Sequence, residues 1–328
     1  MKQALEALLT ALRAGEDAVL CTILEASGST PRGAGAKMAV FSGGGMAGTV
    51  GGGPVEHRCR QTALRALAAG RSQVERFQLR QGNDLGMICG GDVTVFFQMF
   101  RAAVPEHLAL LEGALALLAA HKDSWMVTSI GTAGEWSAEL AAQPDAALER
   151  RPVLTGAGPW RYAEPLGRAG RIFLFGGGHV SQALTPVLAQ VDFPVVICED
   201  RTEFADPARF PAAQEVVMLD FARALARFPV GEADGIVIMT RGHQNDYQVL
   251  RQALETGAGY LGVIGSRAKA AATFERLRAG GFTQADLDRV HTPIGLPIGA
   301  ETPQEIAVSV AAELIRWRAI RTGGKGKL

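Results

Sequence analysis

The stretch that decides the fold is Phe173–Ala183, which reads FLFGGGHVSQA. An apolar strand runs directly into the three glycines at 176–178, and a helical pattern begins at His179. Glycines permit positive φ and close backbone approach, and the start of a helix presents free N–H groups to a ligand. An acidic pair, Glu199 and Asp200, ends the next apolar run, about twenty residues further on, as in a dinucleotide-binding unit. The pattern predicts a Rossmann-type βαβ unit.

The match to a dinucleotide-binding fingerprint is incomplete. Ser181 occupies the third small position, where the fingerprint has glycine. A serine still packs there, so the fold prediction stands, but NAD(P) binding does not follow from the fold alone.

Composition limits the class of protein. The chain has 328 residues, which is comfortable for two domains, and 33 basic against 33 acidic residues give no net charge. Nothing therefore indicates a nucleic-acid or membrane partner. The beginning of the chain reads as an amphipathic helix rather than a signal peptide, and we expect a cytoplasmic protein. The 40 glycines lie in clusters, which favours binding loops built from backbone.

The four cysteines are Cys21, Cys59, Cys89 and Cys198, with no C-x-x-C pair, which is typical of a reducing compartment. Cys21 and Cys198 lie within or at the end of strand patterns and are expected to be packing residues. Cys59 is ambiguous. Cys89 precedes two glycines, so its surroundings could face a cleft, although a free cysteine is usually a small buried hydrophobe.

Residues 1–165 are predicted to form an α+β domain whose core is 1–100. Four strands dominate this core, at 18–25, 37–41, 74–79 and 92–98, with a helix from Pro54 to Gly70 among them. A helix at 105–121 and a strand at 126–130 follow. The stretch 134–170 has weak periodicity and reads as a connecting segment with some structure of its own, which could complete the first domain.

Residues 166–328 are predicted to form a doubly wound parallel sheet. Strand and helix patterns alternate here, with strands at 171–175, 194–198, 215–218, 235–239 and 259–264. The last helix has a clear start, because Thr302-Pro303-Gln304-Glu305 is a capping box with proline at the first helical position.

Three loops in the first domain contain residues that packing alone does not require. The loop 28–37 combines flexible backbone with Arg32 and Lys37, which could hold an anion, although a hairpin with solvated charges is the alternative. The triple glycine at 51–53 opens a helix, either as an anion site or as a tight turn. Glu56 in that helix would repel a phosphate, so it fits a cap or a contact to a neutral group. The third loop is Cys89-Gly90-Gly91.

Two loops in the second domain follow strands of the predicted sheet. One contains His243 and Asp246, and the other contains Ser266 and Arg267. Carboxyl ends of parallel strands are where open α/β sheets bind ligands. His243 and Asp246 alone are too few for a convincing metal site, and a surface histidine with a capping aspartate is the simpler interpretation.

Taken together, these segments resemble the xanthine dehydrogenase accessory proteins of the XdhC/CoxI type. The matching stretches are 28–38, 48–53 with Val55-Glu56, 89–91, 176–180, 199–201, 260–267, 291–296 and 302–307. The resemblance covers nearly the whole chain, in order. Three positions depart from the common pattern: Ser181, Glu199, and Arg241, which replaces a frequent histidine.

The resemblance implies a chaperone of the molybdenum cofactor. Such a protein binds the molybdopterin cofactor, protects it while a cysteine desulfurase sulfurates it, and delivers it to apo-xanthine dehydrogenase. We also expect a homodimer. Cys89 then becomes a candidate contact to molybdenum, since thiolate is a soft ligand. The candidate cofactor-binding residues are Arg32, Lys37, Gly51, Gly52, Gly53, Glu56, Cys89, Gly90, Gly176, Gly177, Gly178, His179, Glu199, Asp200, His243, Ser266 and Arg267.

An NAD(P)-dependent oxidoreductase is the alternative function. The acid after the second Rossmann strand suits a ribose diol and favours it slightly. No nucleophile, base and orienting residue can be assembled from the sequence, however, which favours a binding protein without turnover of its own and assigns no catalytic residue.

Overall fold

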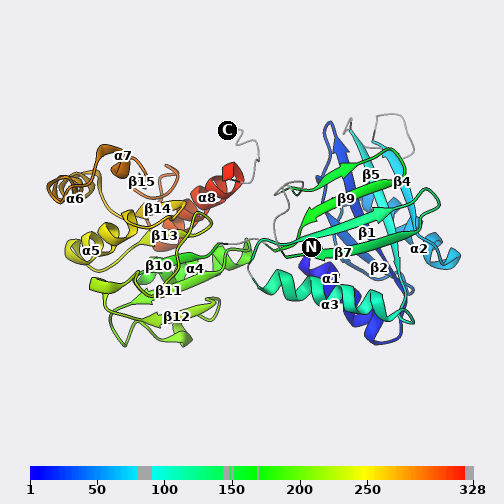
Figure 1. Ribbon diagram of the computed structural model, residues 1–328, viewed down its shortest axis with the longest axis horizontal. Helices are drawn as coiled ribbons and strands as arrows, with labels where there is room; N and C mark the ends of the chain where they lie inside the picture. Colours follow the sequence, from blue (N-terminus) through cyan, green and yellow to red (C-terminus); the bar gives the residue numbers. More distant parts are fainter. Residues whose placement is uncertain (80–90, 121, 143–147, 149–150, 168–169, 322–328) are drawn as a thin grey trace. The chain divides into compact units, whose positions relative to one another are not determined.

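The computed structural model describes residues 1–79, 91–120, 122–142, 148, 151–167 and 170–321. The chain forms two compact units, Met1–Arg168 and Ala169–Leu328. Both are mixed α/β, the first with antiparallel sheets and the second with a parallel sheet, and this confirms the predicted fold class (Figure 1).

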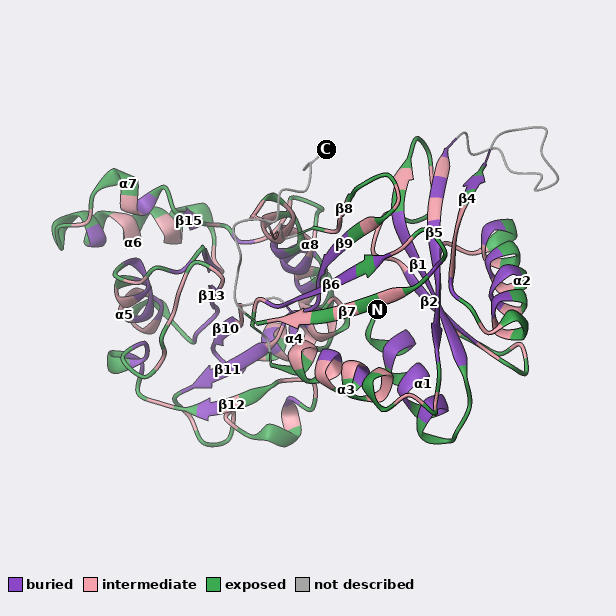
Figure 2. Cartoon of the chain, turned by 45° about the vertical axis from the view of Figure 1, so that its right-hand side comes forward, coloured by how far each residue is buried: buried purple, intermediate pink, exposed green. Residues whose placement is uncertain are grey.

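The first unit is built around a five-stranded antiparallel sheet of order β3-β2-β1-β5-β4. Its strands are β1 (Ala18–Ser27), β2 (Lys37–Phe41), β3 (Met46–Gly48), β4 (Gln73–Gln78) and β5 (Asp92–Phe100). Helix α2 (Gly53–Ala69) covers one face, where Val19, Cys21 and Val95 pack against Val55 and Cys59. Figure 2 shows buried residues running along β1 and β2.

A second antiparallel sheet, of order β7-β6-β9-β8, completes the first unit. Its strands are β6 (Trp125–Ile130), β7 (Trp136–Ala141), β8 (Val153–Thr155) and β9 (Trp160–Pro165). Three strands of this sheet come from the stretch 134–170, so the structure expected within that segment is present and completes the first unit, although the segment is a sheet rather than a connection. Residues of this sheet, with α1 (Lys2–Arg13) and α3 (Pro105–Ala119), form a core with the other face of the first sheet.

The second unit contains a six-stranded parallel sheet of order β12-β11-β10-β13-β14-β15. In chain order this is 3-2-1-4-5-6, the Rossmann arrangement, with the switch point between β10 and β13. The strands are β10 (Ile172–Phe175), β11 (Val195–Glu199), β12 (Glu215–Met218), β13 (Gly235–Ile238), β14 (Tyr260–Val263) and β15 (Val290–His291). The helices are α4 (His179–Gln190), α5 (His243–Leu254), α6 (Arg267–Ala279), α7 (Gln284–Leu287) and α8 (Pro303–Arg321).

Alternating side chains of β10 enter the cores on both faces of this sheet. Phe173 and Phe175 pack on the α5 side, while Ile172 and Leu174 pack on the side of α4 and α8. A strand buried on both faces reads as a continuous apolar run, which is why the sequence reveals it. The predicted capping box at the start of α8 is confirmed, since Thr302 N donates to the Glu305 carboxylate at 2.9 Å and Glu305 N donates to Thr302 Oγ1 at 3.3 Å.

None of the helices in the described ranges is long and apolar enough to cross a membrane.

Candidate functional site

The first candidate site is formed by loops that converge at one end of the β1–β2–β5 sheet. A Cβ built on Gly51 would lie 2.7 Å from the Pro31 Cβ, so the triple-glycine turn touches the 28–36 loop. A Cβ on Gly91 would collide with the carbonyl oxygens of Ser27 and Ser29, so the start of β5 touches the same loop. Both contacts require glycine's lack of a side chain. Three segments distant in sequence thus meet at one place in this unit.

A cavity of about 440 Å³ opens beside the 28–36 loop. It is lined by residues 32–37, by Gly48 and Thr49 at the end of the β2–β3 hairpin, and by Met1 and Gln3. The Arg32 side chain is exposed and makes no hydrogen bond or ion pair with any residue that the structure describes. The N–H groups of Arg32, Gly33 and Ala34 likewise have no acceptor in the described ranges. The cavity therefore offers one guanidinium and several free donors.

Lys37 does not contribute its ammonium group to this cavity. Its side chain is 1% exposed and turns inward, where Nζ lies 2.7 Å from Glu164 Oε1 and 2.9 Å from Thr22 Oγ1. Burial raises the pKa of Glu164, and the adjacent Lys37 opposes that rise. The pair ties the end of the loop to β9 in the second sheet. Only the backbone of Lys37 faces the cavity.

The triple-glycine turn is held by a carboxylate of its own helix. Glu56 Oε2 accepts hydrogen bonds from Thr49 Oγ1 at 2.5 Å and from Gly52 N at 3.2 Å. The Thr49 hydroxyl in turn accepts a bond from Gly51 N at 3.1 Å. Because Gly51, Gly52 and Gly53 have φ of +129°, +74° and +59°, the turn depends on glycine. Glu56 thus acts as a cap, and two N–H groups of the turn are already satisfied.

The cysteines within the described ranges are buried. Cys21 and Cys198 lie in strands and are inaccessible to solvent, which confirms their interpretation as packing residues. Cys59 is equally buried on α2, and burial, with the nearby Glu75 and Glu56, raises its pKa to about 12. A protonated buried thiol is a poor ligand. Cys89 and Gly90 lie outside the described residues.

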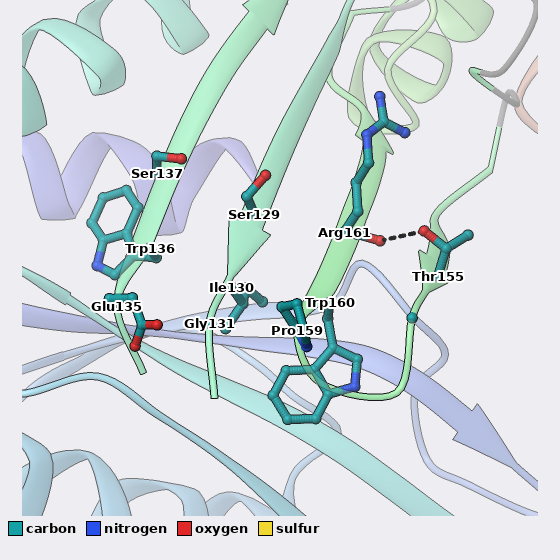
Figure 3. A pocket seen from close by; sticks show the side chains of 11 residues that line it. Ser129, Ile130, Gly131, Glu135, Trp136, Ser137, Thr155, Pro159, Trp160 and Arg161 are labelled. Carbon is teal, nitrogen blue, oxygen red and sulfur yellow. Dashed lines mark hydrogen bonds between the residues drawn. The ribbon is translucent and has the colours of Figure 1, made fainter. Parts of the chain in front are cut away.

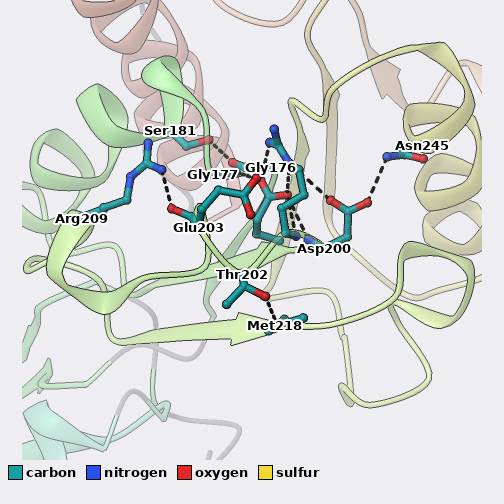
Figure 4. A network of polar contacts seen from close by, with 11 residues as sticks. Gly176, Gly177, Ser181, Asp200, Thr202, Glu203, Arg209, Met218 and Asn245 are labelled. Carbon is teal, nitrogen blue, oxygen red and sulfur yellow. Dashed lines mark hydrogen bonds and ion pairs between the residues drawn. The ribbon is translucent and has the colours of Figure 1, made fainter.

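The second candidate site lies at the carboxyl edge of the parallel sheet. The turn at 176–178 follows β10, a central strand, as predicted, and Gly176 and Gly177 are in close contact with the backbone at Met239 and Phe204. Ser181 Oγ donates a short hydrogen bond to the Gly176 carbonyl (Figure 4). The serine at the third small position therefore fastens the turn to α4, which explains why it can replace glycine.

The Glu199 carboxylate, at the end of the neighbouring strand β11, binds the glycine turn at 176–178. Its Oε2 accepts a bond from Gly177 N at 2.7 Å, and its Oε1 accepts from Asp200 N at 3.0 Å and Arg201 N at 3.2 Å. The Arg201 guanidinium binds both oxygens, at 3.0 and 3.1 Å. Burial raises the pKa of Glu199, but the hydrogen bonds from Arg201 and its neighbours outweigh burial and lower that pKa to about 2. The carboxylate is thus charged and fully occupied.

Asp200 is the acid of the pair that remains accessible. Its side chain is 33% exposed, and its Oδ2 accepts a bond from Asn245 Nδ2 at 3.3 Å, which joins the end of β11 to the start of α5 (Figure 4). Burial and the neighbouring Glu199 raise the pKa of Asp200. Together with His179, exposed at the start of α4, it borders the switch point.

The predicted site residues in the loops after β13 and β14 differ in exposure and in their partners. His243 is exposed at the start of α5, while Asp246 is 1% exposed and accepts bonds from Thr240 Oγ1 at 2.6 Å and Lys269 Nζ at 2.5 Å. Ser266 caps α6 by accepting a bond from Lys269 N, and Arg267 is exposed beside it. No cluster of three or more His, Cys, Asp or Glu suited to a metal occurs in the described part of the chain.

Sequence reasoning missed three residues that organise these sites. Thr49 joins the triple-glycine turn to Glu56, because its hydroxyl accepts a bond from Gly51 N and donates to that carboxylate. Arg201 binds the Glu199 carboxylate, and Lys269 pairs with Asp246. The capping positions of Ser266 and Glu56 could have pointed to Lys269 and Thr49. Arg201 lies only two residues after Glu199, but the sequence does not show that its guanidinium binds this carboxylate.

Two family descriptions match this chain. Residues 172–314 match the XdhC Rossmann domain, and residues 11–78 match the XdhC and CoxI family. A crystal structure of a xanthine dehydrogenase from Bacillus halodurans has a similar fold, with a TM-score of 0.78 at 23% identity over 99% of this chain and 98% of the other.

Three curated relatives align with most of this chain. One from Bacillus subtilis, named as a probable xanthine dehydrogenase subunit, is 28% identical over 92% of this chain and 94% of its own length. The "Molybdenum cofactor insertion chaperone PaoD" of Escherichia coli is 24% identical, over 94% of this chain and 86% of its own length. YqeB of Escherichia coli is 26% identical, but this chain spans only 44% of its length.

Proposed function

The chain belongs to the XdhC and CoxI family, and we propose that it binds the molybdenum cofactor and delivers it to a molybdenum enzyme of the xanthine dehydrogenase type. Two relatives support this role, one named as a molybdenum cofactor insertion chaperone and the other as part of a probable xanthine dehydrogenase. In this proposal the cofactor is cargo, held for transfer rather than for turnover.

The observation that carries the proposal is the unpaired Arg32 beside free backbone donors. Molybdopterin carries a phosphate group, and an arginine fork binds phosphate oxygens in a bidentate manner. The N–H groups of residues 32–34 supply further donors on the same side of the cavity. The N–H groups of Gly51 and Gly52 are already bonded to Thr49 and Glu56, so in this proposal the 28–36 loop holds the phosphate, and the triple glycine supports that loop through the contact of Gly51 with Pro31.

The proposal also covers the residue that contacts the metal, the sulfuration of the cofactor and the oligomeric state. Cys89 contacts molybdenum or the sulfur delivered to it, a cysteine desulfurase performs the sulfuration while the cofactor is bound, and the chain acts as a homodimer. Apo-xanthine dehydrogenase is the recipient.

NAD(P) chemistry has no comparable support. In a dinucleotide site the acid after the second strand binds the ribose diol. Here both oxygens of Glu199, the last residue of β11, are occupied by Gly177, Asp200 and Arg201. The accessible Asp200 that follows it is already bonded to Asn245.

The test is cofactor retention after expression in a host that makes the molybdenum cofactor. We expect the purified chain to carry molybdenum and a pterin, and Arg32→Ala to lower their content at least tenfold while the circular dichroism spectrum is unchanged. Arg71→Ala is the matched control. The Arg71 side chain is also exposed and unpaired in the described ranges, but Arg71 follows the C-terminal end of α2 and does not line the cavity. Equal retention in wild type and Arg32→Ala would refute the assignment of the phosphate site.

A further inference from the structure

The last helix, α8, has apolar residues on both its inner and its outer side (Figure 1). The inner side, with Val310 and Leu314, packs into the core on one face of the parallel sheet. The outer side carries Val308, which is 52% exposed, and Ile315, which is 39% exposed. Apolar residues all round a helix are typical of a helix that is covered on every side. The sequence of α8 therefore indicates a partner for its outer side.

The outer apolar residues of α8 form one stripe along the helix. At 3.6 residues per turn, the half-buried Ala312 lies about 40° and Ile315 about 20° around the helix from Val308. Spacings of four and then three residues are the pattern by which two helices pack side by side. The stripe of Val308, Ala312 and Ile315 thus has the form of a helix-packing seam.

Two opposite charges flank this stripe on the same side. Glu305 and Arg316 are both exposed and lie about 60° and about 80° around the helix from Val308. Arg316 makes no hydrogen bond or ion pair with any residue that the structure describes. Glu305 caps the start of α8 through Oε2, which accepts bonds from Glu301 N and Thr302 N, so its Oε1 can accept another bond. The flank therefore has a carboxylate near one end and a guanidinium near the other.

A second copy of this chain, packed antiparallel, complements both the stripe and its charged flank. A two-fold axis near the middle of the stripe places Val308 of each copy against Ile315 of the other. Flanks on the same side then face each other, so Glu305 of each copy lies within reach of Arg316 of the other. A parallel pair would bring this flank against the opposite one, where no acidic residue lies level with Arg316. Charges beside a helix-packing seam set the orientation of the pair more than they add affinity.

We propose that the chain dimerises through α8, with the Val308–Ala312–Ile315 stripe of each copy packed antiparallel against that of the other. Such a patch is self-complementary, as a two-fold interface requires. The contact is only one helix wide and falls short of the roughly 800 Å² per partner of a standard interface, so we expect the dimer to dissociate at micromolar concentrations. The interface rests on the homodimer of the proposed function and uses none of the residues beside Arg32.

Sedimentation equilibrium of the full chain, from about 1 to about 100 μM, measures the dissociation constant of the dimer. Ile315→Glu places a charge in the stripe and is expected to raise this constant at least tenfold. Ile320→Glu is the matched control, because Ile320 is also an exposed isoleucine of α8 but lies about 120° around the helix from Val308. The control is expected to dimerise as wild type does. A monomeric wild type, or equal constants for wild type and Ile315→Glu, overturns the interface.

Cysteine variants test the antiparallel orientation. A mixture of Val308→Cys and Ile315→Cys chains is expected to form disulfide-linked dimers in air at least tenfold faster than either variant alone, because only the mixture brings the two thiols together. Wild type is the control for the native cysteines. Faster linking of Val308→Cys to itself than to Ile315→Cys overturns the orientation.

The interface and the proposed cargo can fail separately. Ile315→Glu is expected to retain molybdenum as wild type does, since α8 lies in the second unit and the cavity beside Arg32 lies in the first. A wild type that dimerises through α8 but carries no molybdenum would reject the cargo alone. A molybdenum-loaded chain that is indifferent to Ile315→Glu would reject the interface alone.

Discussion

Glu199→Gln tests whether the carboxylate inside the Rossmann glycine turn is structural. Glutamine has nearly the same shape but replaces one acceptor oxygen with an NH₂ donor. In either orientation this NH₂ group faces donors: Gly177 N and Arg201 Nη2 on one side, or Asp200 N, Arg201 N and Arg201 Nε on the other. The variant therefore leaves at least two donors unsatisfied and removes the charge that holds Arg201.

The size of the effect follows from the pKa of Glu199. Its value is lowered from the ordinary 4.5 to about 2 in the folded chain. Each pKa unit corresponds to about 1.4 kcal/mol, so the ionised carboxylate contributes about 3 kcal/mol to the free energy of unfolding at neutral pH. The raised pKa of Asp200 opposes part of this gain. We expect Glu199→Gln to lower the stability of the second unit by about 2 to 3 kcal/mol at pH 7.

The pH dependence gives the assay its specificity. Because the folded pKa lies below the unfolded one, the stabilisation is fully present above pH 4.5 and is lost as the pH falls toward about 2. Urea unfolding of wild type and Glu199→Gln should thus differ most near pH 7 and by less than half as much near pH 3, about one unit above the folded pKa. Glu203→Gln, at an exposed glutamate in the same segment, is the control. A variant as stable as wild type at pH 7, or a difference independent of pH, would refute the reasoning.

Two further predictions concern the first unit. Lys37→Met should lower the free energy of unfolding of this unit by about 3 to 5 kcal/mol, because it leaves Glu164 buried without its partner. In urea unfolding, the double variant Lys37→Met/Glu164→Leu should recover most of this loss. A double variant no more stable than the single one would contradict this. Cys89→Ala should lower molybdenum retention roughly tenfold to a hundredfold with an unchanged melting temperature, while Cys21→Ala should lower the melting temperature and leave retention intact. The reverse pattern would make Cys89 a packing residue.

The Rossmann unit could be predicted from sequence because its signals are local and strong. Strands such as Ile172–Phe175 and Gly235–Ile238 are buried on both faces, so each is an unbroken apolar run between turn residues. The glycine turn and the capping box at Thr302 are equally local. Each of these signals lies within about ten to fifteen consecutive residues, so the local sequence is enough to predict it.

The second sheet of the first unit could not be predicted in the same way. The strand Trp136–Ala141 alternates between intermediate and exposed positions, and Val153–Thr155 is only three residues long. Half-exposed short strands among prolines and glycines have little periodicity. In this sheet Ser129 lies opposite both Ser137 and Arg161 (Figure 3). This alignment of polar residues could not be predicted either, because it depends on the register between strands.

The candidate sites show a related limit, since a charged residue beside a glycine loop does not reveal which way its side chain turns. Lys37 ends a loop rich in donors, but its partner Glu164 lies 127 positions further along the chain. Glu199 ends a strand where a ribose-binding acid is expected, but Arg201, two residues later, and the turn at Gly177 occupy its carboxylate.

The two glycine turns share a physical design. Each has a carboxylate of the chain bonded to a turn N–H group: Glu56 to Gly52 in the first unit and Glu199 to Gly177 in the second. An internal carboxylate keeps a positive-φ turn ordered when no ligand is bound, and its negative charge repels an incoming phosphate at that N–H group. Under the proposed function, the anion is therefore held by neighbouring donors that have no internal acceptor in the described ranges, which in the first unit are Arg32 and the N–H groups of Gly33 and Ala34. A glycine motif in such a chain marks where the backbone must turn sharply, while the unpaired arginine beside it marks where an anion can bind.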